Sequence, residues 1–357
     1  MNSVKILMLV NWKVQYCNKK PSDKQPPDYF VYGDDYWFFR YFENKPVVDI
    51  VDISSCSWLE NIEKNKIRFY IWQTLRIIPK LTEYDLIVSH GMQSGVVVAF
   101  LRRMFKTRAK HVVFDIGSFA SASESGFALK LMQFASKSID GVIYHTSKQI
   151  DYYKKCFPWI VKNSRFIRFG TDLDFFSPDN LKDSSDKNKY ILCAGYAKRD
   201  WNTLIKAYNK LVNKPTLKMI GFVDEKYRNV EGLQQIPFIP VKELINEIYN
   251  AKFCILPLKS FNYSFGQMTL MQQMALKKCV IASNVPSLRD YIIDKKTAFL
   301  FEPEDEYSLK GIIEQLLQDE CRVAEIGENA LRFLENNCNE KIMAHEIEVF
   351  FKEVLYG

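Results

Sequence analysis

The chain has 357 residues, more than the roughly 250–300 residues that one hydrophobic core usually serves, so two domains are expected. Hydrophobic residues make up 47% of it and aromatic residues 14%, which excludes a largely disordered chain, and no apolar run approaches the ~20 residues of a membrane span. The net charge of +7 arises within residues 1–180, which hold 25 Lys and Arg against 18 Asp and Glu. This half is therefore expected to meet an acidic partner: anionic lipid, nucleic acid or an acidic small substrate.

The N-terminal apolar run and the cysteines indicate a cytoplasmic protein. Val4–Val10 is too short for a signal peptide and predicts the first buried strand. None of the eight cysteines forms a C-x-x-C pair, which argues against a zinc or disulfide framework. Cys193, Cys254 and Cys279 lie within apolar runs and are predicted to be buried free thiols, as in a reducing compartment.

Short apolar runs alternate with segments of helical character and predict parallel sheets covered by helices. The first set is Ile6–Val10, Val47–Ile53, Leu86–Ser89, Val112–Phe114, Gly141–Tyr144 and Phe166–Phe169. The second set is Tyr190–Ala194, Thr216–Ile220, Gln235–Ile239, Phe253–Leu258, Val280–Ala282 and Ala298–Phe301. The predicted fold class is α/β, with doubly wound domains at 1–177 and 190–339 and a polar linker at 178–189. A helix at 340–357 is expected to cross back onto the first domain.

Two basic segments account for the charge of the first half. Residues 64–80 interleave Lys and Arg with Ile, Trp and Leu, as a basic amphipathic helix would, and a second cluster spans 102–110. One interpretation is docking on a membrane surface. The other is a helix that packs on the core through its apolar side and leaves its basic side in water.

The segment around Gly266 predicts a site for a phosphorylated ligand. A strand-like run, Phe253–Leu258, is followed by a polar turn, and a helix is expected to begin at about Gln267. The helix thus begins at the carboxyl end of a strand, where ligands bind in open α/β sheets. Its first N–H groups and positive dipole end would face an anion there.

Three segments carry a resemblance to a known family. They are Ile167–Pro178, with the pattern Gly-x-Asp-x-x-x-Phe-x-Pro, then Ile191–Leu204, and finally Ser264–Pro303. In this order and spacing they resemble the GT-B-fold nucleotide-sugar glycosyltransferases, specifically glycosyltransferase family 4. The resemblance implies two Rossmann-like domains that face each other across a cleft, with the nucleotide held mainly by the second.

The resemblance also implies a donor site in the second domain. Lys198 and Arg199 would neutralise the diphosphate leaving group, although they could instead be a surface pair before a helix capped by Asp200. Two positions where the family often carries glutamates are Ser264 and Gln272 here, and the helix could also be an ordinary core helix. The expected donor-binding residues are Gly195, Ser264, Gly266, Gln267, Met268, Thr269 and Gln272.

In the first domain, Asp115 stands where the family often places a histidine beside the reacting sugar. It could orient the acceptor or stabilise positive charge, or it could cap the turn beside Gly117. His90 ends another strand at the same sheet edge. Asp34 and Asp35 are expected either on the acceptor side or as a helix N-cap pair.

The function implied by the resemblance is transfer of a sugar from a UDP- or GDP-linked donor to the hydroxyl of a glycan or lipid-linked acceptor. Retention of configuration, no metal and no cofactor are expected, in surface polysaccharide assembly at the inner face of the membrane. An epimerase or a phosphorylase on the same scaffold remains an alternative. A non-catalytic binding subunit is another, because Asp115, Ser264 and Gln272 depart from the family pattern. No nucleic-acid motif is present.

Overall fold

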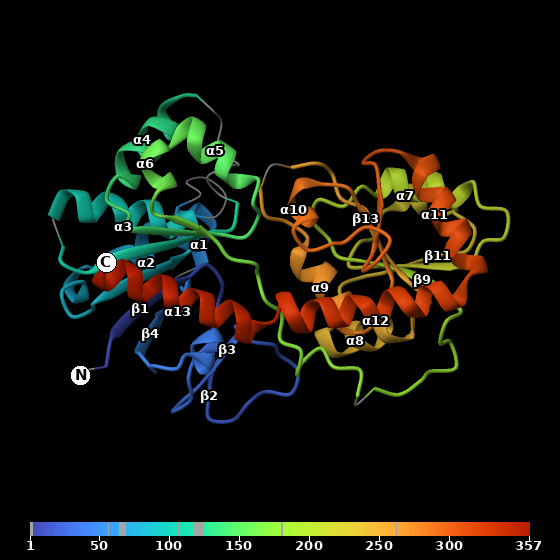
Figure 1. Ribbon diagram of the computed structural model, residues 1–357, viewed down its shortest axis with the longest axis horizontal. Helices are drawn as coiled ribbons and strands as arrows, with labels where there is room; N and C mark the ends of the chain where they lie inside the picture. Colours follow the sequence, from blue (N-terminus) through green and yellow to red (C-terminus); the bar gives the residue numbers. More distant parts are fainter. Residues whose placement is uncertain are drawn as a thin grey trace. The chain divides into compact units, whose positions relative to one another are not determined.

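The computed structural model describes residues 3–55, 57–63, 69–105, 107–117, 125–179, 181–261 and 263–357. The chain forms two compact units, each an α/β assembly (Figure 1). Unit 1 comprises residues 1–168, 262–264 and 343–357. Unit 2 comprises residues 169–261 and 265–342.

Unit 1 is built on a six-stranded parallel sheet in the order β4-β1-β5-β6-β7-β8. Its strands are β1 (Lys5–Val10), β4 (Val47–Val51), β5 (Leu86–His90), β6 (Lys110–Asp115), β7 (Gly141–Tyr144) and β8 (Ser164–Phe166). Its helices include α1 (Ser57–Ile62), α2 (Ile71–Ile77), α3 (Met92–Phe105), α4 (Phe127–Ser136), α5 (Gln149–Cys156) and α6 (Pro158–Val161). Strands β5 and β6 are buried along almost their whole length because helices and loops cover both of their faces.

The two faces of this sheet are covered by different parts of the chain. One face packs Leu7, Ile87 and Val113 against α2 to α6. On the other face, the 3-10 helix η1 (Trp37–Tyr41) places Phe38 5.9 Å, ring to ring, from Phe114. The last helix, α13 (Glu340–Tyr356), completes this face, and its residues 343–356 belong to unit 1.

Unit 2 repeats the architecture with the strand order β11-β10-β9-β12-β13-β14, again all parallel. Its strands are β9 (Tyr190–Ala194), β10 (Thr216–Ile220), β11 (Leu233–Ile236), β12 (Cys254–Leu256), β13 (Val280–Ser283) and β14 (Phe299–Phe301). Its helices are α7 (Trp201–Asn209), α8 (Val241–Asn250), α9 (Gln267–Ala275), α10 (Pro286–Arg289), α11 (Glu306–Gln318) and α12 (Glu320–Asn337), with the 3-10 turn η4 (Glu225–Tyr227). Figure 1 shows the helices flanking this sheet.

Successive residues of the unit 2 strands point to opposite faces, so each strand serves two cores. Leu192 and Cys254 pack with α8 and α9 on one face, whereas Ile191 and Ile255 pack with α7 and α11 on the other. Cys193, Cys254 and Cys279 are buried and free, as predicted, and burial raises the pKa of the Cys193 thiol to about 12.

The predicted α/β class with two doubly wound parallel sheets is confirmed. Two predicted strands are displaced: β8 ends at Phe166 and β11 ends at Ile236, so the runs Phe166–Phe169 and Gln235–Ile239 lie mostly in the loops that follow. The short parallel pair β2 (Gln15–Cys17) and β3 (Tyr29–Val31) was not predicted. Three-residue strands in a polar stretch carry too little periodicity to identify.

Glu348 fastens α13 to unit 1 and makes the fold sensitive to acid. Its carboxylate is 4% exposed and accepts hydrogen bonds from the backbone N–H groups of Glu43 and Asn44 at 2.8 and 3.1 Å. Burial by itself would raise the pKa of this carboxyl. Hydrogen bonds from Lys352, Glu43 and Asn44 outweigh burial and lower the pKa to about 2.

We therefore expect Glu348→Gln to lower the free energy of unfolding at pH 7 by on the order of 2–3 kcal/mol. Because the folded-state pKa lies below the unfolded value, the stabilisation is present above pH 4.5 and is lost as the pH falls through about 2. Urea titrations at pH 7 and pH 2.5, followed by tryptophan fluorescence, measure the difference. Glu353→Gln, in an exposed pair with Arg165, is the control. An equal gap between wild type and Glu348→Gln at both pH values would contradict the assignment.

Candidate functional site

The first candidate site lies at the carboxyl edge of the unit 2 sheet, between β9 and β12. The chain runs from β9 to β10 on one side and returns to β12 on the other, so this is the point where the strand order reverses, and such points form ligand crevices. Two loops meet here, after β9 and after β12. Asp200 N–H donates to Pro257 O at 2.9 Å, and Lys259 N–H donates to Lys198 O at 3.2 Å.

Arg199 joins the two loops through its side chain. It is 6% exposed, and its guanidinium donates to Ala194 O, Ala197 O and the Thr269 hydroxyl, each at 3.1 Å. Burial lowers the pKa of this guanidinium, which nevertheless stays charged at neutral pH. A guanidinium has five N–H groups, so two remain after these three bonds. The sequence alternative of a surface Lys-Arg pair is wrong for Arg199, which is a buried cation, although Asp200 does cap α7.

Gly195 is required by this geometry. Its φ is +116°, a region that favours glycine, and a Cβ there would overlap Nη2 of Arg199. The backbone turn after β9 and the buried guanidinium therefore occupy space that a side chain would need. Neighbouring Gly221, with φ +94°, lies against the Gly195 carbonyl and continues the same close packing.

Lys198 extends next to two aromatic rings. Its ammonium is 4.1 Å from the centroid of Phe261 and 5.5 Å from that of Phe265, and its φ is +60°. Burial lowers the pKa of this amine. The cation–π contacts position the ammonium and leave it positively charged.

Helix α9 begins at Gln267, as the sequence predicts, and its first turn contacts Arg199 through Thr269. Gly266 is its N-cap with φ +86°, and a Cβ there would lie 2.5 Å from Leu258 Cδ1. No described side chain caps this helix, so an anion can take that place. The predicted donor residues differ in burial. Gln267 is buried and donates to Ser287 O at 2.9 Å. Met268 is 46% exposed, and Thr269 and Gln272 are half-buried. Ser264 is grouped with unit 1 by its contacts.

The second candidate site lies at the corresponding edge of unit 1, where the strand order reverses between β1 and β5. Trp12 follows β1, His90 ends β5, and Trp37 begins η1. The ring of His90 is 4.7 Å from that of Trp12, 5.4 Å from that of Trp37 and 5.4 Å from that of Phe114. The sequence pointed to His90 and to the loop that contains Trp37, but not to Trp12.

The imidazole of His90 is 5% exposed, and neither ring nitrogen has a hydrogen-bond partner among the described residues. Burial, with a further contribution from His145, lowers the pKa of His90 to about 3, so it is neutral at physiological pH. A neutral imidazole carries one donor and one acceptor nitrogen. Buried polar groups are rarely left without partners, which makes His90 a candidate for contact with a ligand or an ordered water.

Asp115 lies at the end of β6 with its carboxylate fully buried. It accepts hydrogen bonds from Gly117 N–H at 3.0 Å, the Tyr153 hydroxyl at 2.6 Å and Gln149 Nε2 at 3.1 Å. This arrangement favours the alternative that Asp115 caps the turn beside Gly117 and ties α5 to the sheet.

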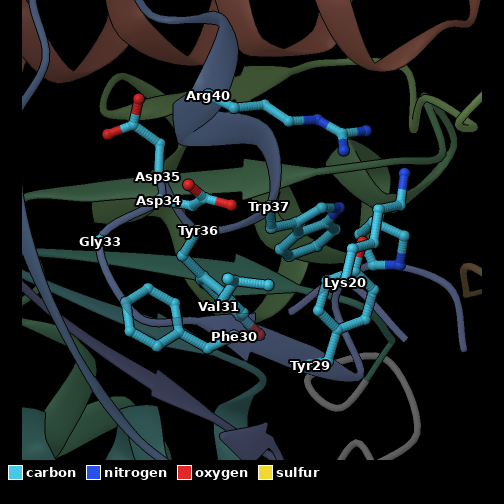
Figure 2. A pocket seen from close by; sticks show the side chains of 11 residues that line it. Lys20, Tyr29, Phe30, Val31, Gly33, Asp34, Asp35, Tyr36, Trp37 and Arg40 are labelled. Atoms are coloured by element: carbon cyan, nitrogen blue, oxygen red, sulfur yellow. The ribbon is translucent and has the colours of Figure 1, made fainter. Parts of the chain in front are cut away.

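Asp34 and Asp35 line a pocket of about 350 Å³ together with Lys20, Trp37 and Arg40 (Figure 2). The alternative that they cap a helix is wrong, because the N-cap of η1 is Tyr36 and no side chain bonds to it. Asp35 pairs with Lys45 at 3.0 Å. Lys20 and Arg40 were missed, since Lys20 lies in a polar stretch and Arg40 in an aromatic run, and no spacing pattern links the two.

Exposed apolar side chains also lie on α1, α2 and the 3-10 turn η3 (Ile78–Lys80). The alternative of a helix packed through its apolar side holds only in part for α2. Ile77 packs in the core, but Gln73 and Thr74 are buried beside it, whereas Trp72 and Leu75 are 43% and 45% exposed. Gln73 Nε2 donates to Val10 O at 2.8 Å and Val51 O at 2.7 Å. These bonds hold the polar side of α2 toward the sheet, which explains why Trp72 and Leu75 face outward. Lys64, Lys66 and Arg68 lie outside the described residues.

The second basic cluster belongs partly to the core. Arg102 is 9% exposed and pairs with Asp140 at 2.9 Å, while Arg103 lies over the Phe134 ring at 4.4 Å. Arg102 therefore belongs neither to an exposed lipid-binding patch nor to a solvated helix end. Within the described residues, no helix is long and apolar enough to cross a membrane, and no group of metal-ligating residues is found.

Comparison with known proteins gives matches in sequence and in structure. Residues 179–333 match the family model described as glycosyl transferases group 1. The capsular polysaccharide biosynthesis glycosyltransferase CapM of Staphylococcus aureus is 31% identical over 91 residues, which cover 26% of this chain and 24% of CapM. The matched stretch thus spans about a quarter of that relative.

Solved structures match the whole chain. A glycosyltransferase from Rickettsia africae has a TM-score of 0.72 at 16% identity, covering 100% of both chains. Sucrose-phosphate synthase from Thermosynechococcus elongatus has a TM-score of 0.69 at 18% identity, covering 98% of both chains. HepE of Anabaena, solved with UDP-glucose, has a TM-score of 0.68 at 16% identity, covering 98% of this chain and 99% of its own. At these identities the likeness establishes the fold, which is GT-B.

Because Gly195 packs against Arg199, the addition of one methyl group at position 195 should lower the stability of the fold. Gly195→Ala should lower the free energy of unfolding of unit 2 by about 1–3 kcal/mol, because the residue must adopt positive φ and displace a buried guanidinium. Urea titration followed by far-UV circular dichroism measures the change. Gly311→Ala is the matched control: it lies in α11 with no atom within 4 Å of the added Cβ, and it should leave stability unchanged or raise it. Equal effects of the two substitutions would refute the packing argument.

Proposed function

We propose that this protein is a glycosyltransferase, because residues 179–333 match the family model of glycosyl transferases group 1 and the chain has the GT-B fold. It moves a sugar from a nucleoside diphosphate sugar to an acceptor hydroxyl. The observation that carries the proposal is Arg199, a buried cation that joins the loop after β9 to helix α9 where the unit 2 strand order reverses.

The diphosphate binds in unit 2 between two kinds of donor. The remaining N–H groups of Arg199 and the ammonium of Lys198 supply positive charge, and the first turn of α9, from Gly266 to Thr269, supplies backbone N–H groups. The Thr269 hydroxyl already accepts a bond from Arg199 and still has its own proton to donate. Gln272, one turn further along α9, bonds a ribose hydroxyl in the place of a glutamate.

These groups stabilise the leaving group of the reaction. When the acceptor hydroxyl attacks the anomeric carbon, the sugar–phosphate bond breaks and negative charge grows on the phosphate oxygens. Fixed cations and oriented N–H groups in a partly dehydrated site stabilise that charge more than water would. The leaving phosphate takes the acceptor proton, because the carboxylate of Asp115 is already occupied by three hydrogen bonds. Transfer proceeds with retention and without a metal.

We propose UDP as the nucleotide and an acceptor from surface polysaccharide assembly. HepE, which shares the fold, was solved with UDP-glucose, and CapM acts in capsular polysaccharide biosynthesis. These two likenesses support UDP over GDP and a polysaccharide acceptor over a lipid-linked one.

The donor site is tested by Arg199→Ala. Loss of a charge-assisted hydrogen-bond donor should weaken UDP binding at least tenfold, because such bonds contribute about 1.5–3 kcal/mol. Isothermal titration with UDP and GDP measures the affinities, and circular dichroism checks that the variant folds. Arg228→Ala, a 77% exposed side chain on unit 2, should bind as wild type does. No binding of either nucleotide by the wild type, or unchanged binding by Arg199→Ala, would reject the donor site.

We further propose that the exposed face of α1, α2 and η3 rests on anionic lipid. Its large apolar side chains are Trp58, Ile71, Trp72, Leu75 and Ile78, between 38% and 65% exposed. Arg76 and Lys80 lie among them in the sequence and supply positive charge for lipid headgroups. Tryptophan and basic residues beside an apolar face are typical of helices that lie in a membrane interface.

Lipid contact is tested with vesicles that contain phosphatidylglycerol. The double substitution Trp72→Glu and Leu75→Glu should reduce partitioning at least tenfold, because it removes two apolar side chains from the interface and adds negative charge. The control is Phe238→Glu, an 88% exposed aromatic residue of unit 2, which should bind as wild type does. Sedimentation at low salt measures the bound fraction. If wild type stays in the supernatant, the proposal fails.

A further inference from the structure

A groove of about 530 Å³ lies in unit 2, apart from the candidate donor site. One wall is the turn at 293–297, which comes directly before β14, and the other wall is a face of α12. Because all strands of this sheet are parallel, the start of β14 lies at the amino edge, whereas Arg199 follows the carboxyl end of β9. The groove and Arg199 therefore lie at opposite edges of the sheet. The volume is within the range of small-ligand sites, roughly 300–1,000 Å³.

The lining of the groove is basic, although it belongs to a half of the chain that is neutral. Residues 181–357 hold 24 Lys and Arg and 24 Asp and Glu. Four basic residues line the groove against a single acidic one: Lys295, Lys296, Arg322 and Arg332 against Glu325. Arg322 pairs with Glu325 at 2.7 Å, so these two charges cancel. The other three cations have no ion-pair partner among the described residues.

The turn that carries two of these lysines is fixed by hydrogen bonds. Lys295 N–H donates to Ala298 O at 2.8 Å, and the Thr297 hydroxyl accepts a bond from Ile293 N–H at 2.9 Å. Arg322 Nη2 donates to Lys295 O at 2.5 Å, which fastens the turn to α12. Lys295 has φ +58°, a conformation that is uncommon for residues other than glycine, asparagine and aspartate. Such strain occurs preferentially at functional sites.

The face of α12 that lines the groove also carries amide side chains. Lining residues 322, 325, 329, 332 and 336 recur every three or four positions, so they lie on one side of the helix. Asn329 has no hydrogen-bond partner among the described residues. Asn336 Nδ2 donates to Arg332 O at 2.7 Å, which orients its amide and leaves its oxygen as an acceptor. Amides offer both donors and acceptors, as sugar hydroxyls do.

The apolar part of the lining is small. Ile293 is 47% exposed, and Phe333 packs partly on the core of unit 2. A membrane-binding face needs several exposed apolar side chains, and single-stranded nucleic acid is usually held by exposed aromatic rings on which its bases stack. The lining therefore favours a ligand that stays in water and offers anionic groups and hydroxyls.

We propose that this groove binds an acidic glycan, a chain of sugars that carries carboxylate or sulfate groups. The anionic groups lie beside Lys295, Lys296 and Arg332, and an Arg fork suits the paired oxygens of such groups. Sugar hydroxyls bond to the amides of Asn329 and Asn336. A single anion would not use cations from two separate elements or the amides between them, whereas an acidic glycan uses both.

The groove retains the glycan and does not react with it, because Arg199 lies at the other edge of the sheet. A glycan held there stays near the enzyme at a raised effective concentration. That this glycan is the polysaccharide which the protein extends rests on the proposed function. The binding itself does not.

The test is isothermal titration of the full chain at low salt with trigalacturonate, its neutral methyl ester, a heparin tetrasaccharide and citrate. We expect at least one of the two acidic glycans to bind at least tenfold more tightly than the methyl ester and than citrate. The preferred glycan shows whether carboxylate or sulfate is favoured. Equal binding of the methyl ester overturns the anionic class, and equal binding of citrate overturns the glycan.

Variants locate the binding. The double substitution Lys296→Gln and Arg332→Gln should weaken the acidic glycan about tenfold or more. Both side chains are exposed, so the variant keeps the fold. The matched control, Lys182→Gln with Lys242→Gln, removes two exposed charges of unit 2 outside the groove and should have no effect. Unchanged binding by the groove variant, or an equal loss in the control, overturns the assignment.

Two further titrations separate this proposal from its alternatives. If decauridylate binds as tightly as the acidic glycans and loses the same factor in the groove variant, the groove belongs to nucleic acid and the proposal fails. The groove variant should bind UDP as wild type does. If UDP binds and no acidic glycan does at millimolar concentration, the groove assignment is wrong and the donor site stands. If an acidic glycan binds and UDP does not, the donor site fails and the groove remains a glycan site.

Discussion

A single buried guanidinium organises the candidate donor site. Arg199 bonds two carbonyls of its own loop and the hydroxyl of Thr269, so the loop after β9 and the first turn of α9 are held at fixed spacing. A buried cation is costly unless its N–H groups are satisfied. Here two backbone oxygens and one hydroxyl satisfy three of them, and an anion would satisfy the rest. The same arrangement requires glycine at position 195, because any side chain there would occupy the place of the guanidinium.

The same topological rule positions both candidate sites. In unit 2 the strand order reverses between β9 and β12, and in unit 1 it reverses between β1 and β5. Connections that leave a parallel sheet in opposite directions open a space at its carboxyl edge. Unit 2 fills this edge with cations and a helix N-terminus, which suits a diphosphate. Unit 1 fills it with tryptophans, a neutral imidazole and a polar pocket, which suits a sugar.

Helix α2 shows how one pair of hydrogen bonds can reverse the orientation expected of an amphipathic helix. Gln73 reaches the carbonyls of Val10 and Val51 at the ends of β1 and β4, which turns Trp72 and Leu75 outward. Burial of apolar area favours the opposite orientation. The exposed apolar side chains therefore indicate contact with a partner surface. The positive charge of the neighbouring basic residues is complementary to anionic lipid.

By itself, the sequence determined the alternation of buried strands and helices and the α/β class with two parallel sheets, and it located the turns at Arg199 and Gly266 where an anion site is proposed, because apolar periodicity and glycine-containing turns are local signals. The tertiary structure alone decided what the polar side chains do. Asp115 was bound by Gln149 and Tyr153 of α5, His90 was enclosed by aromatic rings, and Lys20 and Arg40 were brought to one pocket. These outcomes depend on contacts between residues far apart in the chain, and no spacing along the sequence encodes such contacts.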